Sequence, residues 1–295
     1  MPTLTAYVAN CLMGGDEVTS NSDGSWIRDL IIFNCNGRVF RFRQNPDVIN
    51  KKSRPFEGTF YETTTVEVEN VESYQREIIL KEIDNICWLL SFACQARVIC
   101  YGHDFLDTGS RKAAFGKANL FRPPIEIADG TAVKNFIEQT YPAYAKLNKK
   151  RKISTVIDYL TQLNQPGQPI EINLLIIFIT LENLKDTYAK QAKIPYAKGY
   201  YRKSPTKPGK PGRQFNFEEL LVEMFKAVGM RKGVKQIITL RNELIHSGLS
   251  RKSYSSQIKL YERTQDLVRE YLVRLLNYHG YFFTYSSRGT APKKI

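Results

Sequence analysis

The 295-residue chain has few of the residues from which metal sites are built, with three histidines and five cysteines. No two cysteines are spaced as Cys-x-x-Cys, so the sequence indicates no structural zinc site, and we expect neither a metal nor a cofactor. The cysteines are scattered: Cys11, Cys35, Cys87, Cys94 and Cys100. Their odd number, and the absence of a signal-peptide pattern after Met1, favour the reducing cytoplasm.

Long hydrophobic runs are also missing. The most apolar stretch, Ile172 to Leu181, is interrupted by Asn173 and Thr180. It is too short to cross a bilayer and predicts a buried helix, so we expect no membrane partner. The apolar content of 42% and the charged content of 24% are ordinary for a globular protein.

Acidic residues are scarce relative to basic ones. The chain holds 43 Lys and Arg against 29 Asp and Glu, a formal net charge of +14. Such an excess attracts polyanions, with nucleic acid as the first candidate and an anionic membrane surface as the second. A basic protein without a polyanionic partner is the remaining interpretation.

The first 70 residues are rich in β-branched and aromatic residues between turn signals. Strands are predicted at residues 5–8, 26–33, 38–42 and 63–68. Asn36-Gly37, between two of them, is a typical two-residue hairpin turn. We predict a small N-terminal antiparallel β region over residues 1–70.

From Glu72 onward the apolar residues recur at helical spacing. The pattern predicts a long loop over 101–124, a frayed tail over 286–295 and these helices: 72–97, 129–141, 154–163, 170–192, 215–224, 232–245 and 259–278. The predicted fold class is therefore mainly α, with a helical domain over residues 71–295.

One segment of that domain, residues 196–213, combines prolines and glycines with cations and the tyrosines Tyr196, Tyr200 and Tyr201. Cations beside aromatic rings suit phosphates and stacked bases, although a solvated loop is the simpler alternative. The RNA-binding candidates are the cations of this segment and one on the helix that follows: Lys198, Arg202, Lys203, Lys207, Lys210, Arg213 and Lys235.

The most informative motif is Arg241-Asn242-Glu243-Leu244-Ile245-His246, near the end of a predicted helix that stops at Gly248. Arginine binds phosphates, and histidine transfers protons near neutral pH. A solvated arginine and a histidine favoured by the helix dipole are the alternative. In a helix, Arg241 and His246 are about 140° apart, whereas Asn242 and His246 share a polar face.

The stretch Leu240 to Gly248 resembles the signature of the HEPN superfamily, α-helical domains with Arg, four to six residues and then His. Residues Ile170 to Leu184 resemble the preceding helix of ApeA-like HEPN proteins, and the resemblance implies that Glu182 holds Arg241. It also implies a helical bundle and a metal-independent endoribonuclease that works as a homodimer. In that reading Arg241, Asn242 and His246 act on RNA, whose 2′-hydroxyl is the nucleophile, and the protein is a toxin or an anti-phage effector.

Two other functions stay open: a non-catalytic HEPN-like module that binds RNA or a nucleotide or acts as a scaffold, and a membrane-surface protein. The other two histidines are interpreted without a catalytic role. His103 is predicted in a loop, where a histidine is structural or solvent-exposed, and His279 is predicted near the end of the last helix as a favourable cap.

Overall fold

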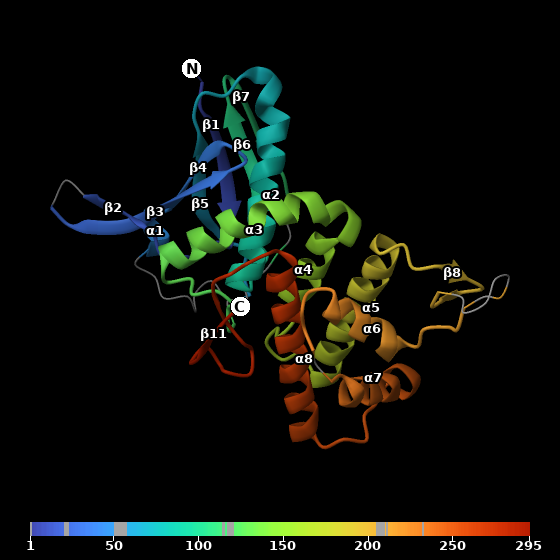
Figure 1. Cartoon of the computed structure of the whole chain (residues 1–295). Coiled ribbons are helices and arrows are strands. Elements are labelled where there is room, and N and C mark those ends of the chain that lie inside the picture. Colours follow the sequence, from blue (N-terminus) through green and yellow to red (C-terminus); the bar gives the residue numbers. More distant parts are fainter. Residues whose placement is uncertain are drawn as a thin grey trace. The chain divides into compact units, whose positions relative to one another are not determined.

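The computed structural model describes residues 2–20, 24–49, 58–113, 116, 121–204, 210, 212–231 and 233–295 (Figure 1). It divides into two compact units. The first comprises Met1–Lys146, Asn164–Pro166 and Leu276–Ile295, and the second comprises Leu147–Leu163 and Gly167–Leu275. The boundary between the units falls within helix α3 (Gly130–Arg151). Its residues up to Lys146 belong to the first unit, and those from Leu147 belong to the second.

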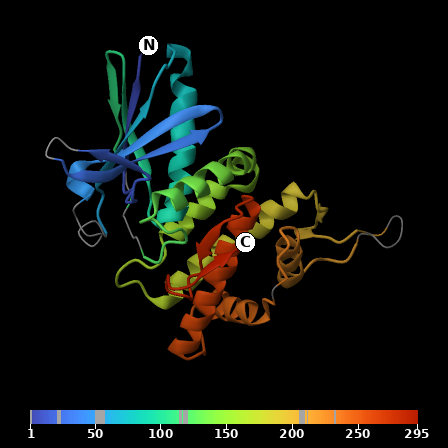
Figure 2. The same cartoon turned by 60° about the vertical axis from the view of Figure 1, so that its left-hand side comes forward.

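A seven-stranded antiparallel sheet in the order β2-β3-β4-β5-β1-β6-β7 forms the centre of the first unit (Figures 1 and 2). The strands are β1 (Leu4–Ala9), β2 (Glu17–Ser20), β3 (Trp26–Cys35), β4 (Arg38–Gln44), β5 (Glu62–Val68), β6 (Ile99–Phe105) and β7 (Thr108–Arg111). The remaining elements of this unit are α1 (Pro46–Ile49), the short helix η2 (Ser73–Gln75), α2 (Arg76–Cys94), most of α3 (Gly130–Arg151), β10 (Tyr281–Phe283) and β11 (Pro292–Lys294).

The apolar faces of the sheet and of α2 form the core of the first unit. Helix α2 packs against β1 and β6, where Leu4, Ala6 and Val8 point inward at alternate positions. Phe136 of α3 stacks on Phe92 of α2 at 5.8 Å between ring centroids. Cys87 and Cys94 of α2 are buried free thiols, seven residues apart and therefore on one face of the helix.

The predicted hairpin turn at Asn36-Gly37 is confirmed. Cys35 pairs with Arg38, so the two residues form the entire connection between β3 and β4. Both have positive φ angles, 52° at Asn36 and 74° at Gly37. Asparagine and glycine tolerate this conformation, and its twist matches that of the strands.

The prediction of a mainly α fold is wrong, because the sheet makes this a mixed α and β protein. Residues 101–124, predicted as a loop, contain most of β6 and all of β7. These strands pair with β1 and with each other, and the first unit extends beyond the predicted boundary at residue 70. Glycines and polar side chains on both faces of the hairpin concealed the period-2 pattern on which strand prediction depends.

In its described residues the second unit is helical, apart from the hairpin of β8 and β9 and a β-bridge between Arg202 and Gln214. It contains α4 (Ile153–Thr161), α5 (Ile170–Gln191), the strands β8 (Tyr196–Ala197) and β9 (Tyr200–Tyr201), α6 (Phe217–Lys226), α7 (Lys235–Ser247) and α8 (Tyr254–Leu275). Helix α5 packs against each of the other four of these helices. This central place explains the apolar run from Ile172 to Leu181 in its first half.

The C-terminal segment also differs from the prediction. Residues 286–295, expected to fray, include β11, which pairs with β10. Helix α8 ends at Leu275, so His279 lies beyond it and is not a helix cap; its backbone N–H donates to Gln139 Oε1 at 3.1 Å. In the described part of the chain, no helix has the length and apolar character needed to cross a membrane.

Candidate functional site

Helix α7 presents the Arg-Asn-x-x-x-His motif at its C-terminal half. Its buried stripe is Ile237, Leu240 and Leu244, and Gly248 ends the helix with a φ of 71°. The backbone N–H of Gly248 donates to the Leu244 carbonyl at 2.9 Å, a left-handed C-terminal cap. Asn242 and His246 of the motif lie off this stripe and are exposed.

The structure brings Glu182 of α5 and Arg241 of α7 into an ion pair, as the resemblance implies. Arg241 Nη2 donates to Glu182 Oε1, while Nη1 donates to Asn242 Oδ1 at 2.8 Å. The second carboxylate oxygen of Glu182 accepts from Lys185 Nζ at 2.6 Å. One carboxylate therefore fixes two cations from two helices, with charge-assisted hydrogen bonds.

Phe217, the first residue of α6, lies against both cations. Arg241 Cζ is 4.4 Å and Lys185 Nζ is 4.7 Å from the ring centroid. The Arg241 side chain is only 19% exposed, and its Nε–H is buried without a hydrogen-bond partner among the described residues. A buried donor in this state gains free energy from any acceptor that reaches it.

Arg241 and Glu182 line an open cavity of about 460 Å³ on the second unit. Five of its other lining residues are aromatic: Tyr196, Tyr200, Tyr201, Phe215 and Phe217. Tyr201 is held by a 2.6 Å hydrogen bond from its hydroxyl to Asp186 Oδ1, and burial together with this bond raises the pKa of Tyr201. Two of the rings remain accessible, Tyr196 at 64% and Tyr200 at 51% exposure.

Three of the predicted RNA-binding cations form contacts within the chain. Arg202 donates to the carbonyls of Ala197 and Gly212, at 3.3 and 3.2 Å. Lys203 and Arg213 both pair with Glu219. Hydrogen bonds from Lys203, the Asn216 backbone N–H and Arg213 lower the pKa of Glu219 to about 2.

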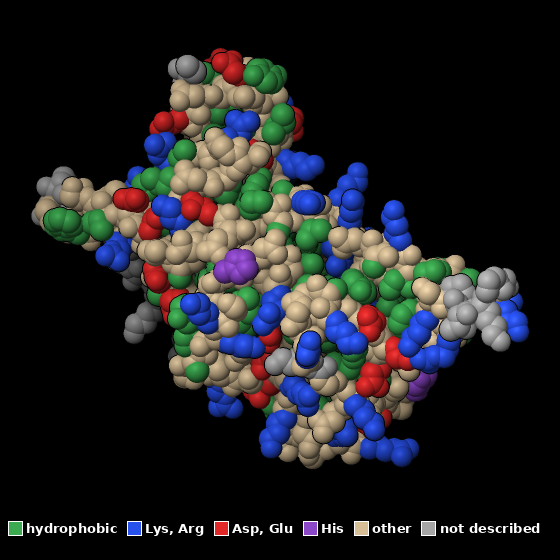
Figure 3. Space-filling view, in the orientation of Figure 1, with side chains coloured by type: hydrophobic (Ala, Val, Ile, Leu, Met, Phe, Trp, Pro, Cys, Tyr) green, Lys and Arg blue, Asp and Glu red, His purple; other side chains and the backbone are tan. Residues whose placement is uncertain are grey.

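The other predicted cations are placed differently. Lys198, at the turn between β8 and β9, Lys210, and Lys235 at the start of α7 are exposed, whereas Lys207 lies outside the described residues. On the face drawn in Figure 3, basic side chains alternate with acidic ones over α6, α7 and α8.

His246 is exposed in the last turn of α7 and is not part of the cavity that Arg241 lines. Among the residues that the structure describes, its side chain forms no hydrogen bond or ion pair. The five-residue spacing explains the separation, because it rotates the two side chains about 140° apart. A single copy of the chain therefore presents Arg241 and His246 as two separate features.

Sequence reasoning missed Lys185 and Phe217. The sequence does indicate the Lys185 contact, because a cation three residues after Glu182 lies on the same face of the helix. Asn216 and Glu219 form a capping box that marks the start of α6, but the contact of Phe217 with Arg241 is purely tertiary. The prediction that His103 lies in a loop is wrong. His103 lies on β6 and lines a cavity of the first unit.

Comparisons with protein-family models, with curated proteins and with solved structures found no match to this chain.

Proposed function

We propose that the second unit is a metal-independent endoribonuclease of HEPN type and that α7 carries its reactive residues. The observation that carries the proposal is the Glu182–Arg241 ion pair, which fixes a guanidinium on the wall of a cavity rich in aromatic side chains. A fixed arginine beside stacking surfaces suits a phosphodiester flanked by unpaired bases. The substrate class is therefore single-stranded RNA.

The proposed reaction uses the nucleophile that RNA itself contains. His246 accepts the proton of a ribose 2′-hydroxyl, and the 2′-oxygen forms a bond to the adjacent phosphorus. The bond from phosphorus to the 5′-oxygen breaks, and that oxygen takes up a proton. The products are a 2′,3′-cyclic phosphate and a 5′-hydroxyl, so DNA is not cleaved.

Arg241 stabilises the negative charge that grows on the phosphoryl oxygens, and Glu182 acts as a positioning residue by fixing the guanidinium. Asn242 accepts from Arg241 through its carbonyl, which leaves its amide N–H groups to donate to a phosphoryl oxygen or to His246. Exposed Lys198, Lys210 and Lys235 contact the RNA backbone in this proposal.

A second copy of the chain completes the proposed site. One histidine contributes only about 10²–10⁴-fold as a general acid or base, and two histidines supply both roles at once. His246 is exposed and lies outside the cavity of its own chain, where a partner copy can reach it. We therefore propose a homodimer in which the two motifs face one RNA strand.

Cleavage of RNA inside a cell suits a toxin or an anti-phage effector, and we propose such a role in the cytoplasm. The five cysteines are free thiols, which is compatible with a reducing compartment.

The deciding experiment incubates the purified protein with a labelled single-stranded RNA in excess EDTA. The expected products end in a 2′,3′-cyclic phosphate, and a DNA strand of the same sequence stays intact. The His246→Ala variant, purified in the same way, controls for contaminating nucleases and should lose at least about 10²-fold in rate. Cleavage by this variant at the wild-type rate would exclude His246 from the reaction.

The second candidate function is a module that binds RNA without cutting it. It is favoured by the separation of His246 from the cavity of Arg241 within one chain. In this case the same incubation yields a salt-sensitive complex and intact RNA.

A further inference from the structure

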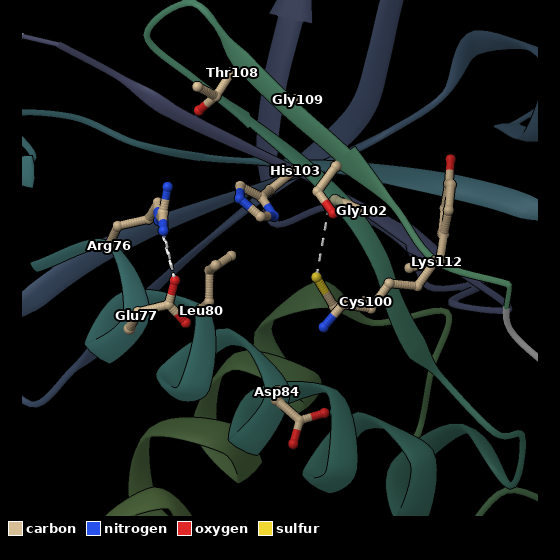
Figure 4. Close-up of a pocket in the computed structure, with 12 residues that line it drawn as sticks. Arg76, Glu77, Leu80, Asp84, Cys100, Gly102, His103, Thr108, Gly109 and Lys112 are labelled. Atoms are coloured by element: carbon tan, nitrogen blue, oxygen red, sulfur yellow. Dashed lines mark hydrogen bonds and ion pairs between the residues drawn. The ribbon is translucent and has the colours of Figure 1, made fainter.

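A second cavity lies within the first unit, between α2 and the β6–β7 hairpin (Figure 4). Its volume is about 490 Å³, within the usual range for small-molecule sites. Both walls belong to the first unit, so this cavity is separate from the motif on α7. It has no role in the function proposed above.

The regular spacing of each element aims polar side chains into this cavity. Arg76, Leu80 and Asp84 are four residues apart on α2 and therefore share one face. On the opposite wall, His103 and Ser110 are cross-strand partners of β6 and β7, so they point to the same side of the sheet. In the view of Figure 4, Arg76 and Lys112 lie on opposite sides of His103.

The charges around the cavity are only partly matched. Arg76 pairs with Glu77 at 3.0 Å. Asp84 and Lys112 line the same cavity with opposite charges, yet neither forms an ion pair within the described part of the chain. Burial raises the pKa of Asp84, whereas Arg97, a hydrogen bond from Trp88, and Lys112 lower it; the residue as a whole is exposed.

We propose that this cavity binds a small zwitterion, the chemical class of the free amino acids. Its ammonium group pairs with Asp84, and its carboxylate pairs with Lys112. His103 and Ser110 donate hydrogen bonds to the carboxylate, while Leu80 contacts the apolar part of the ligand.

The mixed lining favours a zwitterion over ligands of one charge. A phosphate or a nucleotide would satisfy Lys112 but would lie beside the carboxylates of Asp84 and Glu77. A polyamine would satisfy Asp84 but would lie beside Lys112 and Arg76. Only a molecule with both charges compensates Asp84 and Lys112 together, without like-charge repulsion.

Calorimetric titration of the whole protein tests the proposal, with each standard amino acid as a probe at millimolar concentration. Adenosine monophosphate and putrescine serve as probes in which one charge predominates. At least one amino acid should bind, and more tightly than both of these. Binding of no amino acid, or tighter binding of the nucleotide or the amine, would overturn the proposal.

Variants then test the two contacts. Asp84→Asn and Lys112→Gln should each weaken binding by about tenfold or more, while Asp84→Glu retains the charge and should lose less. Asp107→Asn and Lys81→Gln alter exposed charges on the same hairpin and helix outside the cavity, and should leave the affinity unchanged. An affinity that is the same in both cavity variants as in the wild type would show that the amino acid binds elsewhere.

Discussion

Glu182 is the residue on which the proposed nuclease site most depends, because its two carboxylate oxygens pair with cations from α5 and α7. Its side chain is 34% exposed, so solvent screens these pairs and they add little to stability. Their effect is geometric: without the carboxylate, Arg241 has no acidic partner among the described residues. Function and stability should therefore respond differently to its loss.

The Glu182→Gln variant should unfold at nearly the wild-type urea concentration, with a free energy of unfolding lower by about 1 kcal/mol or less. Its RNA cleavage rate should fall by about tenfold or more, because a misaligned guanidinium stabilises the transition state less well. Glu223→Gln, which removes the ion pair with Lys226 on α6, is the matched control. Equal cleavage by both variants would remove Glu182 from the site.

His103 gives a pH-dependent prediction for the first unit. Burial, reinforced by Arg76, lowers its pKa below the ordinary 6.5. The folded state then binds a proton less readily than the unfolded state, so His103 disfavours folding as the pH falls through 6.5, and this penalty is absent well above that pH. In an NMR titration its ring should change shift below pH 6.5, and Arg76→Gln should move the midpoint upward. No movement would mean that Arg76 does not act on His103.

At the scale of elements, α5 organises the second unit because it contacts α4, α6, α7 and α8. Its apolar run contains both buried and exposed isoleucines. Ile177 is fully buried, whereas Ile179 is 51% exposed. The same substitution at these two positions therefore distinguishes the loss of packing from a change in helix propensity.

Ile177→Ala should lower the free energy of unfolding by about 2–5 kcal/mol, because it leaves a cavity among packed side chains. Ile179→Ala should change it by about 0.5 kcal/mol or less, because that side chain is largely in water. Urea unfolding followed by circular dichroism measures both. Similar losses in the two variants would contradict the difference in burial between Ile177 and Ile179.

For the whole molecule, the proposal requires two copies of the chain to share one site. An excess of the His246→Ala variant, mixed with wild-type protein and allowed to exchange subunits, should reduce cleavage per wild-type chain. The reason is that each mixed dimer has lost one of its two histidines. Unchanged activity, in a sample that light scattering shows to be dimeric, would mean that each copy works alone.

The sequence by itself determined those features that depend on neighbouring residues. The β3–β4 turn follows from Asn36-Gly37, and the buried stripe and C-terminal cap of α7 follow from its leucine spacing and Gly248. In these cases the backbone geometry is set locally, by sterics and by the helical period. The separation of Arg241 from His246 on α7 was predictable for the same reason.

Only the tertiary structure decided the rest. The polar β6–β7 hairpin forms strands because the backbone of β6 pairs with that of β1. The local sequence of the hairpin does not indicate this pairing. The contact of Phe217 with Arg241 joins residues of two helices, and the cavity that contains His103 exists only between α2 and a sheet edge. Such long-range contacts depend on how whole faces pack, and this information is spread over the entire chain.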